Sequence, residues 1–382
     1  MKQILRRVLL AGLAVLLVGT AGCGLSEPEQ DYSEPPQELS VGSPYKYHYA
    51  RLEPVEQHAY NAVLSAIGEF PQEIKVPVLT QEQLHNFYTA LLYDNPALFY
   101  LGSSPTVRQS KKSAVFCPQY LMNAADYASM LRKCDAAAET ILTLAEEKET
   151  DFEKERVVHD RLIAQCSYSE SDNNPYKSSV YGVLSAGSAA CEGYAKTAKY
   201  LLDRLSIPCY VVVGNSTPPG SRTQAHMWNI VQIGGEWYHL DLTWDDPVLE
   251  KGGDVISYSY FNVTDSQIRA THTEYESENA CTATEQNFFV HERLAFVDFG
   301  AAEKARTVEI AVQMLELGSD GFQLKFGSQS GFEKAQTVLF EDEGIYELLQ
   351  KIREASGAEF ATDRVSYFCT ESNRTIDIIL ER

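Results

Sequence analysis

The sequence has few basic residues: 32 lysines and arginines stand against 53 aspartates and glutamates, which gives a formal net charge of −21. The phosphates of nucleic acid would repel such a chain, so we expect no nucleic-acid partner. The sequence also lacks CxxC and HExxH, spacings that are typical of zinc sites. We therefore expect no metal and no cofactor.

Long apolar runs are scarce as well, because the run from Val8 to Val18 is too short for an ordinary spanning helix. Positive residues precede this run at Lys2, Arg6 and Arg7, a pattern typical of a signal peptide. Small residues and Cys23 follow, and the segment from Thr20 to Cys23 resembles a bacterial lipobox, in which cleavage precedes a cysteine whose thiol is lipidated. We expect a signal peptide over residues 1–22 and an extracytoplasmic, membrane-anchored lipoprotein. The alternative is a plain signal peptide with an incidental cysteine.

The segment after Cys23 is rich in Glu, Pro and Ser and can bury little apolar surface, so residues 23–44 are expected to form a flexible tether. Of the eight cysteines, six remain when Cys23 and Cys191 are set aside. The expected compartment permits disulfides, but a chain of this size does not depend on them. We interpret the six as mostly buried apolar residues and leave their pairing open.

The length of 382 residues predicts two or three domains. Residues 45–150 contain amphipathic stretches at helical spacing and predict a helical domain without an acid–base constellation. Residues 151–275 contain the informative motifs. Residues 276–382 show short strands and a helix, including a closing hairpin around residues 371–373, which indicate a small α/β domain.

Cys191 stands at the start of a predicted amphipathic helix whose apolar stripe includes Tyr194, Ala198 and Leu201. The unpaired N–H groups and positive dipole end of a helix favour a thiolate, the reactive form of cysteine. The same N–H groups could stabilise an oxyanion. A cysteine at a helix start is weak evidence alone, because most such cysteines are inert.

A predicted hairpin places a histidine and an aspartate together. Residues 225–233 and 236–243 read as strands joined by Gly234 and Gly235. If these glycines are the two turn residues, His226 and Asp241 are diagonal neighbours on one face, within side-chain reach. The carboxylate could then orient the imidazole while the other ring nitrogen faces the thiol. A turn one residue longer would put the two on opposite faces.

Three blocks together resemble the bacterial transglutaminase-like superfamily: Ala190 to Ala195, Ala225 to Asn229, and His239 to Pro247. The resemblance covers roughly residues 152–264 and implies an α+β fold with a papain-like core. It also implies a triad of Cys191 as nucleophile, His226 as base and Asp241 as the residue that orients the histidine.

Other residues compete for these roles. His239 is an alternative base, Asp245 and Asp246 are alternative carboxylates, and His226 could be a satisfied core histidine. The second oxyanion donor stays open among Tyr168, Gln165 and the backbone N–H of Cys191. We favour the backbone group and keep the Tyr168 hydroxyl as a further candidate.

The implied chemistry is acyl transfer through a thioester, with hydrolysis favoured over cross-linking. The expected substrates are peptides, proteins or the peptide part of peptidoglycan at the cell envelope. One alternative is a non-catalytic lipoprotein that binds a protein or the cell wall. Another is a purely structural envelope lipoprotein, which would have no cleft that joins the cysteine to the histidine.

Overall fold

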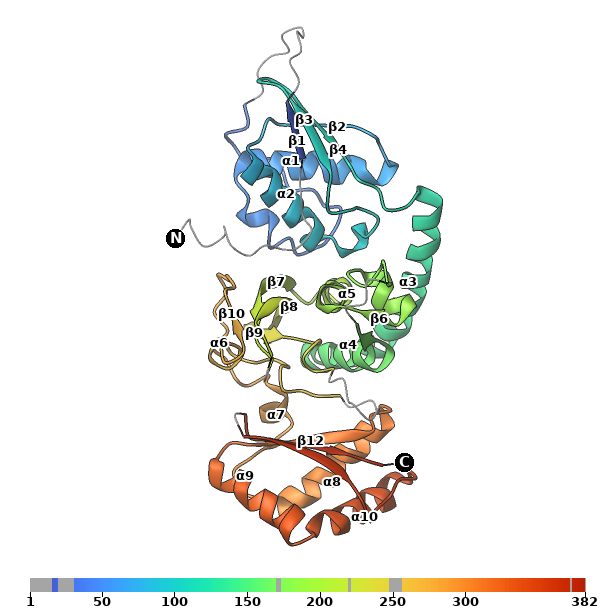
Figure 1. Ribbon diagram of the computed structural model, residues 1–382, viewed down its shortest axis with the longest axis vertical. Coiled ribbons are helices and arrows are strands. Elements are labelled where there is room, and N and C mark those ends of the chain that lie inside the picture. The colour runs from blue at the N-terminus through green and yellow to red at the C-terminus, as the bar shows by residue number, and fades with distance from the viewer. Residues whose placement is uncertain are drawn as a thin grey trace.

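The structure is a computed structural model that describes residues 16–19, 31–169, 173–218, 221–246, 256–371 and 373–381. Three layers follow one another along the longest axis (Figure 1). We call them the N-terminal region (16–19 and 31–117), the central region (124–281) and the C-terminal region (288–381). Cys23 lies outside the described residues, as does the expected signal peptide apart from residues 16–19. Within the described part of the chain, no helix is long and apolar enough to cross a membrane.

The N-terminal region, predicted as a helical domain, also contains a small sheet. Its helices α1 (Pro54–Ala66) and α2 (Gln81–Asp94) share one core with a four-stranded sheet of order β1-β3-β4-β2. The strands are β1 (Leu16–Gly19), β2 (Ile74–Val76), β3 (Thr106–Gln109) and β4 (Ala114–Cys117). Strands of three or four residues are too short to show a clear alternating pattern in the sequence, which explains why they were missed.

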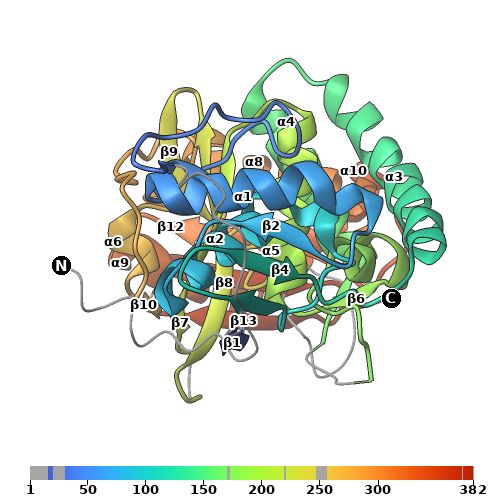
Figure 2. The same cartoon turned by 90° about the horizontal axis from the view of Figure 1, so that it is seen from above.

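Helix α3 (Ala124–Glu146) forms over the predicted amphipathic stretch but packs with the central region. Its buried face, which includes Cys134, Ala138 and Ile141, joins the core of the central region beside α4 (Asp151–Gln165). Figures 1 and 2 show α3 running along one side of the molecule, from the level of the N-terminal layer to that of the central layer. The core of the central region therefore begins before residue 151, the start expected from the sequence.

The central region places one helix against an antiparallel sheet. Helix α5 (Cys191–Arg204) buries Tyr194, Ala198 and Leu201 on one face, as its apolar stripe predicts. The sheet has the order β10-β7-β8-β9. Its strands are β7 (Cys209–Ser216), β8 (Gln224–Ile233), β9 (Glu236–Leu240) and β10 (His272–Thr273). Two short strands, β5 (Ser167–Tyr168) and β6 (Ser188–Ala189), pair in parallel just before α5, and α6 (Asp265–Ile268) precedes β10. The fold class is α+β, as expected.

The predicted register of the hairpin is confirmed. Ile233 pairs with Glu236, and Gly234 and Gly235 form the turn with φ angles of 62° and 89°. The returning strand was predicted to reach Thr243 but ends at Leu240. There the carboxylate of Asp241 accepts the backbone N–H of Thr243 at 3.0 Å, which turns the chain out of the sheet.

The C-terminal region is a sheet with helices on one face. The sheet has the order β11-β12-β14-β13, formed by β11 (Ala295–Phe296), β12 (Gly321–Phe326), β13 (Ser366–Thr370) and β14 (Thr375–Ile379). The helices on this face are α8 (Ala301–Glu316), α9 (Gln329–Gln336) and α10 (Gly344–Ser356), whereas the short helix α7 (Phe288–His291) lies on the side of the central region. The sheet lies between the central region and the helices α8 to α10 (Figure 1). The predicted hairpin around residues 371–373 is β13 and β14, paired antiparallel.

The described cysteines are all free. Cys134, Cys166, Cys209 and Cys281 are buried, whereas Cys117 and Cys369 are half-buried. The interpretation of the six remaining cysteines as mostly buried apolar residues is therefore confirmed.

Replacing Gly235 by alanine should destabilise the protein by about 1–2 kcal/mol, because Gly235 has a φ of 89° and an L side chain resists that conformation. No atom lies within 4 Å of an added Cβ there, so the cost comes from the backbone alone. Gly234→Asn is the matched control, since asparagine tolerates the left-handed region at φ 62°. Urea unfolding of both variants measures the difference. Equal stability of the two variants would contradict the prediction.

Candidate active site

Cys191 is the first residue of α5, and its side chain is half-buried. The N-cap residue is Ala190, which makes no side-chain capping bond. The Gly193 amide donates to the Ala190 carbonyl at 2.9 Å, so the amides of Cys191 and Glu192 are the ones left for another acceptor. The Ala190 amide donates to the carbonyl of Lys177 at 2.9 Å and holds this loop in place. A Cβ on Gly193 would lie 2.4 Å from the same carbonyl, which explains why a glycine stands in the first turn.

His226 and Asp241 meet in a buried hydrogen bond. Nε2 of His226 lies 2.7 Å from Oδ2 of Asp241, and the two residues are only 3% and 1% exposed. His226 lies on β8, and Asp241 follows the end of β9 directly. Because Nε2 is engaged by the carboxylate, Nδ1 is the ring nitrogen available to the sulfur of Cys191.

The charges in this group favour an imidazolium. Burial alone would lower the pKa of His226, but the charge and hydrogen bond of Asp241 and a hydrogen bond with Cys191 raise it to about 10. Burial acts to raise the pKa of Asp241, yet the adjacent His226 and His272 together hold it well below its usual range. A positive imidazole beside the sulfur and a fixed carboxylate behind the imidazole are the arrangement that stabilises a reactive thiolate.

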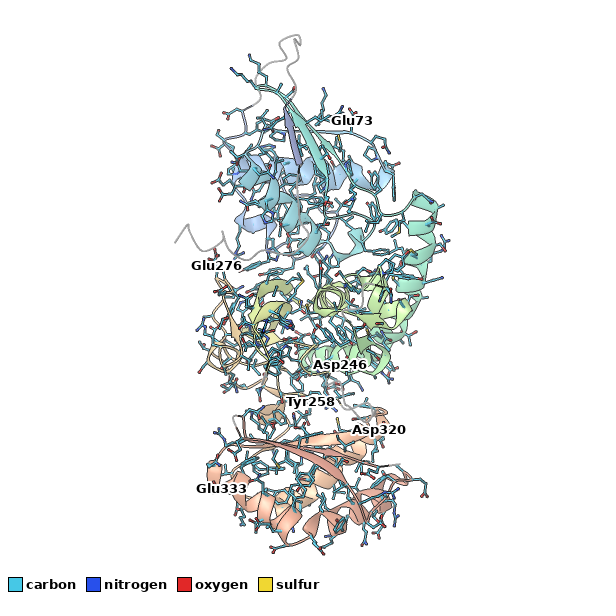
Figure 3. All side chains as sticks on the ribbon, viewed as in Figure 1. Glu73, Asp246, Tyr258, Glu276, Asp320 and Glu333 are labelled. Carbon is cyan, nitrogen blue, oxygen red and sulfur yellow. The ribbon has the colours of Figure 1, made fainter. Side chains whose placement is uncertain are left out.

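Three side chains of the sequence motifs fasten α5 to the hairpin. The Asn229 side chain donates to the Ala195 carbonyl at 3.0 Å, which joins β8 to the second turn of α5. The Tyr194 hydroxyl donates to the carboxylate of Asp246, which joins α5 to the loop after Asp241. Figure 3 labels Asp246 in the central region beside α4 and α5. Cys191 and His226 are 35 positions apart in the sequence. These hydrogen bonds, made about one helical turn after Cys191, fix the position of α5 relative to β8 and so hold the two residues near each other.

The alternatives to the triad have partners of their own. Nδ1 of His239 accepts from the Trp228 indole at 3.0 Å, and its Nε2 lies 3.0 Å from Asp265, so both ring nitrogens are engaged. Asp245 lies 3.3 Å from Nε2 of the buried His159 on α4. His226 is therefore the histidine that the structure brings to Cys191, and Asp241 is the carboxylate that it brings to His226.

His272 is a member of this group that the sequence analysis missed. It is fully buried on β10, and its Nε2 lies 3.0 Å from the same Asp241 oxygen that accepts from His226. Its Nδ1 lies 2.9 Å from the hydroxyl of Thr271. No motif surrounds it, and β10 has only two residues, so neither spacing nor periodicity indicates it.

Two groups of side chains have the composition of metal sites. They are His226 with Asp241 and His272, and His239 with Asp265 and Cys281. In both groups, hydrogen bonds between histidine nitrogens and a carboxylate account for the close approach. In the first group, a metal at Asp241 would compete with the bond that orients His226.

The remaining candidates lie near the start of α5. Tyr168 on β5 pairs with Ala189, which lies two residues before Cys191. Gln165 is the last residue of α4, shortly before β5. The Tyr168 side chain is half-buried against the central core, and its role as oxyanion donor stays a prediction. From the N-terminal region, Tyr93 and Leu92 of α2 pack in one cluster with Cys191, so this region forms a wall beside the sulfur.

Residues 137–242 match the profile of the family described as the transglutaminase-like superfamily. This match lies within the central region, which is thus the transglutaminase-like part of the chain. A curated relative, human kyphoscoliosis peptidase, is 25% identical over 158 residues, which are 38% of this chain and 24% of that protein. The chain thus spans about a quarter of the length of that relative.

Two solved structures resemble the chain at low similarity. The crystal structure of a TGase is 16% identical and has a TM-score of 0.26, over 50% of this chain and 56% of that one. A Cytophaga hutchinsonii protein, described as a proposed cysteine protease, is 18% identical with a TM-score of 0.23, over 34% of this chain and 51% of that one. The chemistry general to the superfamily is thiol-dependent acyl transfer or hydrolysis.

Replacing His272 by phenylalanine should raise the pH midpoint of Cys191 alkylation by about one unit. The phenylalanine keeps an aromatic ring at position 272 but cannot donate to Asp241. The lost charge-assisted hydrogen bond contributes about 1.5–3 kcal/mol. A less firmly held Asp241 stabilises the imidazolium less, so the thiolate forms at higher pH. Iodoacetamide labelling rates against pH measure this midpoint.

His272→Gln is the matched variant, because its amide can still donate to Asp241 and should restore most of the labelling rate. Thermal unfolding of both variants separates a loss of fold from a loss of orientation. If both variants label like the wild type, His272 has no positioning role.

Proposed function

We propose that the chain is a cysteine enzyme that cleaves or exchanges peptide or amide bonds, with Cys191, His226 and Asp241 as its catalytic triad. The observation that supports this most strongly is the buried 2.7 Å bond between His226 and Asp241 beside a cysteine at a helix start. Membership of the superfamily supports the same chemistry. The roles of the three residues rest on this geometry.

In the first half-reaction, the Cys191 thiolate attacks the carbonyl carbon of an amide. The first-turn amides of α5 stabilise the oxyanion, with the Tyr168 hydroxyl proposed as a further donor. When the C–N bond breaks, the His226 imidazolium gives its proton to the leaving amine, and a thioester with Cys191 remains.

In the second half-reaction, His226 takes a proton from water or from an amine as it attacks the thioester carbon. The C–S bond breaks and the thiolate is restored. Water yields a carboxylic acid and an amine yields a new amide. The triad serves both outcomes, and we propose hydrolysis as the main one, with peptides, proteins or peptidoglycan peptides as substrates.

Cys191→Ala should abolish labelling by a thiol-directed activity probe at neutral pH, because only Cys191 among the described cysteines has an imidazolium beside it. Cys117→Ala and Cys369→Ala are matched controls, since these thiols are also half-buried and should label no faster than free cysteine. Mass spectrometry of peptide and peptidoglycan digests, with and without added amine, then identifies product and acceptor. Equal labelling at Cys117 or Cys369, or unchanged labelling of Cys191→Ala, would favour a non-catalytic binding protein.

We also propose that Cys23 carries a lipid that holds the protein at the outer face of a membrane. Support comes from the basic, apolar and small-residue order of positions 2–23. Cys23→Ser should move the expressed protein from the membrane fraction to the soluble fraction, as judged by immunoblot after carbonate washing. Cys117→Ser is the control and should stay with the membrane. Retention of Cys23→Ser in membranes would contradict lipid anchoring.

A further inference from the structure

A pocket of about 200 Å³ lies between the central region and the C-terminal sheet. Its central wall is formed by Trp244 and Tyr260, and its opposite wall by side chains of β12, β13 and β14. Figure 3 places Tyr258 close to the junction of the two regions, two residues before Tyr260. The C-terminal region lies outside the part of the chain that matches the family profile.

One row of cross-strand neighbours forms the wall of the sheet. Asp377 on β14 pairs with Gln323 on β12 and with Phe368 on β13. Register partners point to the same face of a sheet, so these three side chains all face the central region. Phe368 is 54% exposed, although it is a large apolar side chain. Its neighbour Tyr367 points to the other face and stacks on Phe340 at 3.6 Å.

The polar groups of the pocket are held in fixed positions. The Gln323 amide donates to Asp377 at 2.6 Å and to the hydroxyl of Ser259 at 3.1 Å. Ser259 in turn donates to the Gln323 carbonyl at 3.3 Å. An amide, a carboxylate and a hydroxyl are thus oriented before any ligand arrives, and hydroxyl-bearing ligands can donate to and accept from such groups.

The aromatic groups complete the pocket. Trp244 packs edge to face on Tyr260 at 4.9 Å, and Phe368 offers an exposed ring across from them. Aromatic rings bind the apolar faces of ring-shaped ligands without requiring a charge. Burial and the charge of Asp245 raise the pKa of Asp377 to about 6, although the Gln323 hydrogen bond and the charge of Lys325 act to lower it. Such a carboxyl group attracts a cation less than a free carboxylate does, so the pocket does not depend on a cationic ligand.

We propose that this pocket binds a sugar ring, with the ring faces against Trp244 and Phe368 and the hydroxyls on Asp377 and its neighbours. The volume suits one ring-sized group rather than a length of peptide.

The pocket is coupled to the catalytic group through Trp244. The Trp244 ring lies 6.2 Å from the ring of His226 and 4.8 Å from that of His272. If the proposed function holds, the substrate is a peptide linked to a glycan, and the sugar occupies the pocket while the peptide reaches Cys191. This second step rests on the proposed function, whereas sugar binding itself does not.

The test follows the indole N–H signals of the ¹⁵N-labelled full chain by NMR during titration with N-acetylglucosamine or glucose. The Trp244 signal is assigned with Trp244→Phe. We expect it to shift with at least one sugar and to saturate in the millimolar range. Phe368→Ala should weaken binding by about three- to tenfold, through the loss of one aromatic contact. Tyr367→Ala is the matched control, an exposed aromatic on the opposite face, and should bind like the wild type.

Three results would overturn the proposal: no shift of the Trp244 signal with either sugar, equal sugar affinity in Phe368→Ala and wild type, or a Trp244 shift with the cation butylamine but with neither sugar. The same titration of Cys191→Ala should be unchanged, so sugar binding is decided independently of enzyme activity. For an active protein, a glycan-linked peptide should have a lower KM than the free peptide, and Phe368→Ala should remove this difference.

Discussion

The carboxylate of Asp241 is the group on which the rest of the site depends. One oxygen accepts from two histidines, His226 and His272, and the other accepts from the backbone amides of Thr243 and Trp244. These hydrogen-bond donors offset the free-energy cost of burying a negative charge away from water. The same bonds end β9, turn the chain toward Trp244 and aim the His226 ring, so the local fold and the electrostatics of the site have one origin.

The residues around the triad act as ties between elements. Asn229 and Tyr194 belong to the sequence blocks that resemble the superfamily, yet neither contributes to the proposed chemistry. They join α5 to β8 and to the loop after Asp241. Asp245 connects the same loop to α4 through its contact with His159. The pKa of His159 is raised to about 9, because the carboxylates of Asp160 and Asp245 outweigh the effect of burial. The blocks therefore specify the distance between sulfur and imidazole as well as the reacting groups.

The two flanking regions meet the central region on opposite sides. The N-terminal region contributes Tyr93 and Leu92 beside Cys191, and its His48 ring lies 3.0 Å from the Val211 carbonyl on β7. The C-terminal sheet meets the loop of Trp244 and Tyr260 from the other side and encloses the pocket proposed for a sugar. One flank thus borders the nucleophile and the other borders the loop that carries the aspartate.

Local features, which depend on neighbouring residues, could be predicted from the amino-acid sequence. The amphipathic period predicted helices within residues 45–150 and the helix α5 that begins at Cys191. The paired glycines predicted the register that aligns His226 with Asp241. The order of the three blocks indicated the superfamily. Features that depend on contacts between distant segments became visible only in the folded chain. His272 reaches Asp241 from a two-residue strand. The sheet of the N-terminal region is built from strands too short to show a period. The pocket exists only because two regions pack together and bring Phe368, Gln323 and Asp377 to face Trp244. Periodicity and motif spacing report on one element at a time, whereas a shared carboxylate or a pocket between layers exists only after the elements have packed.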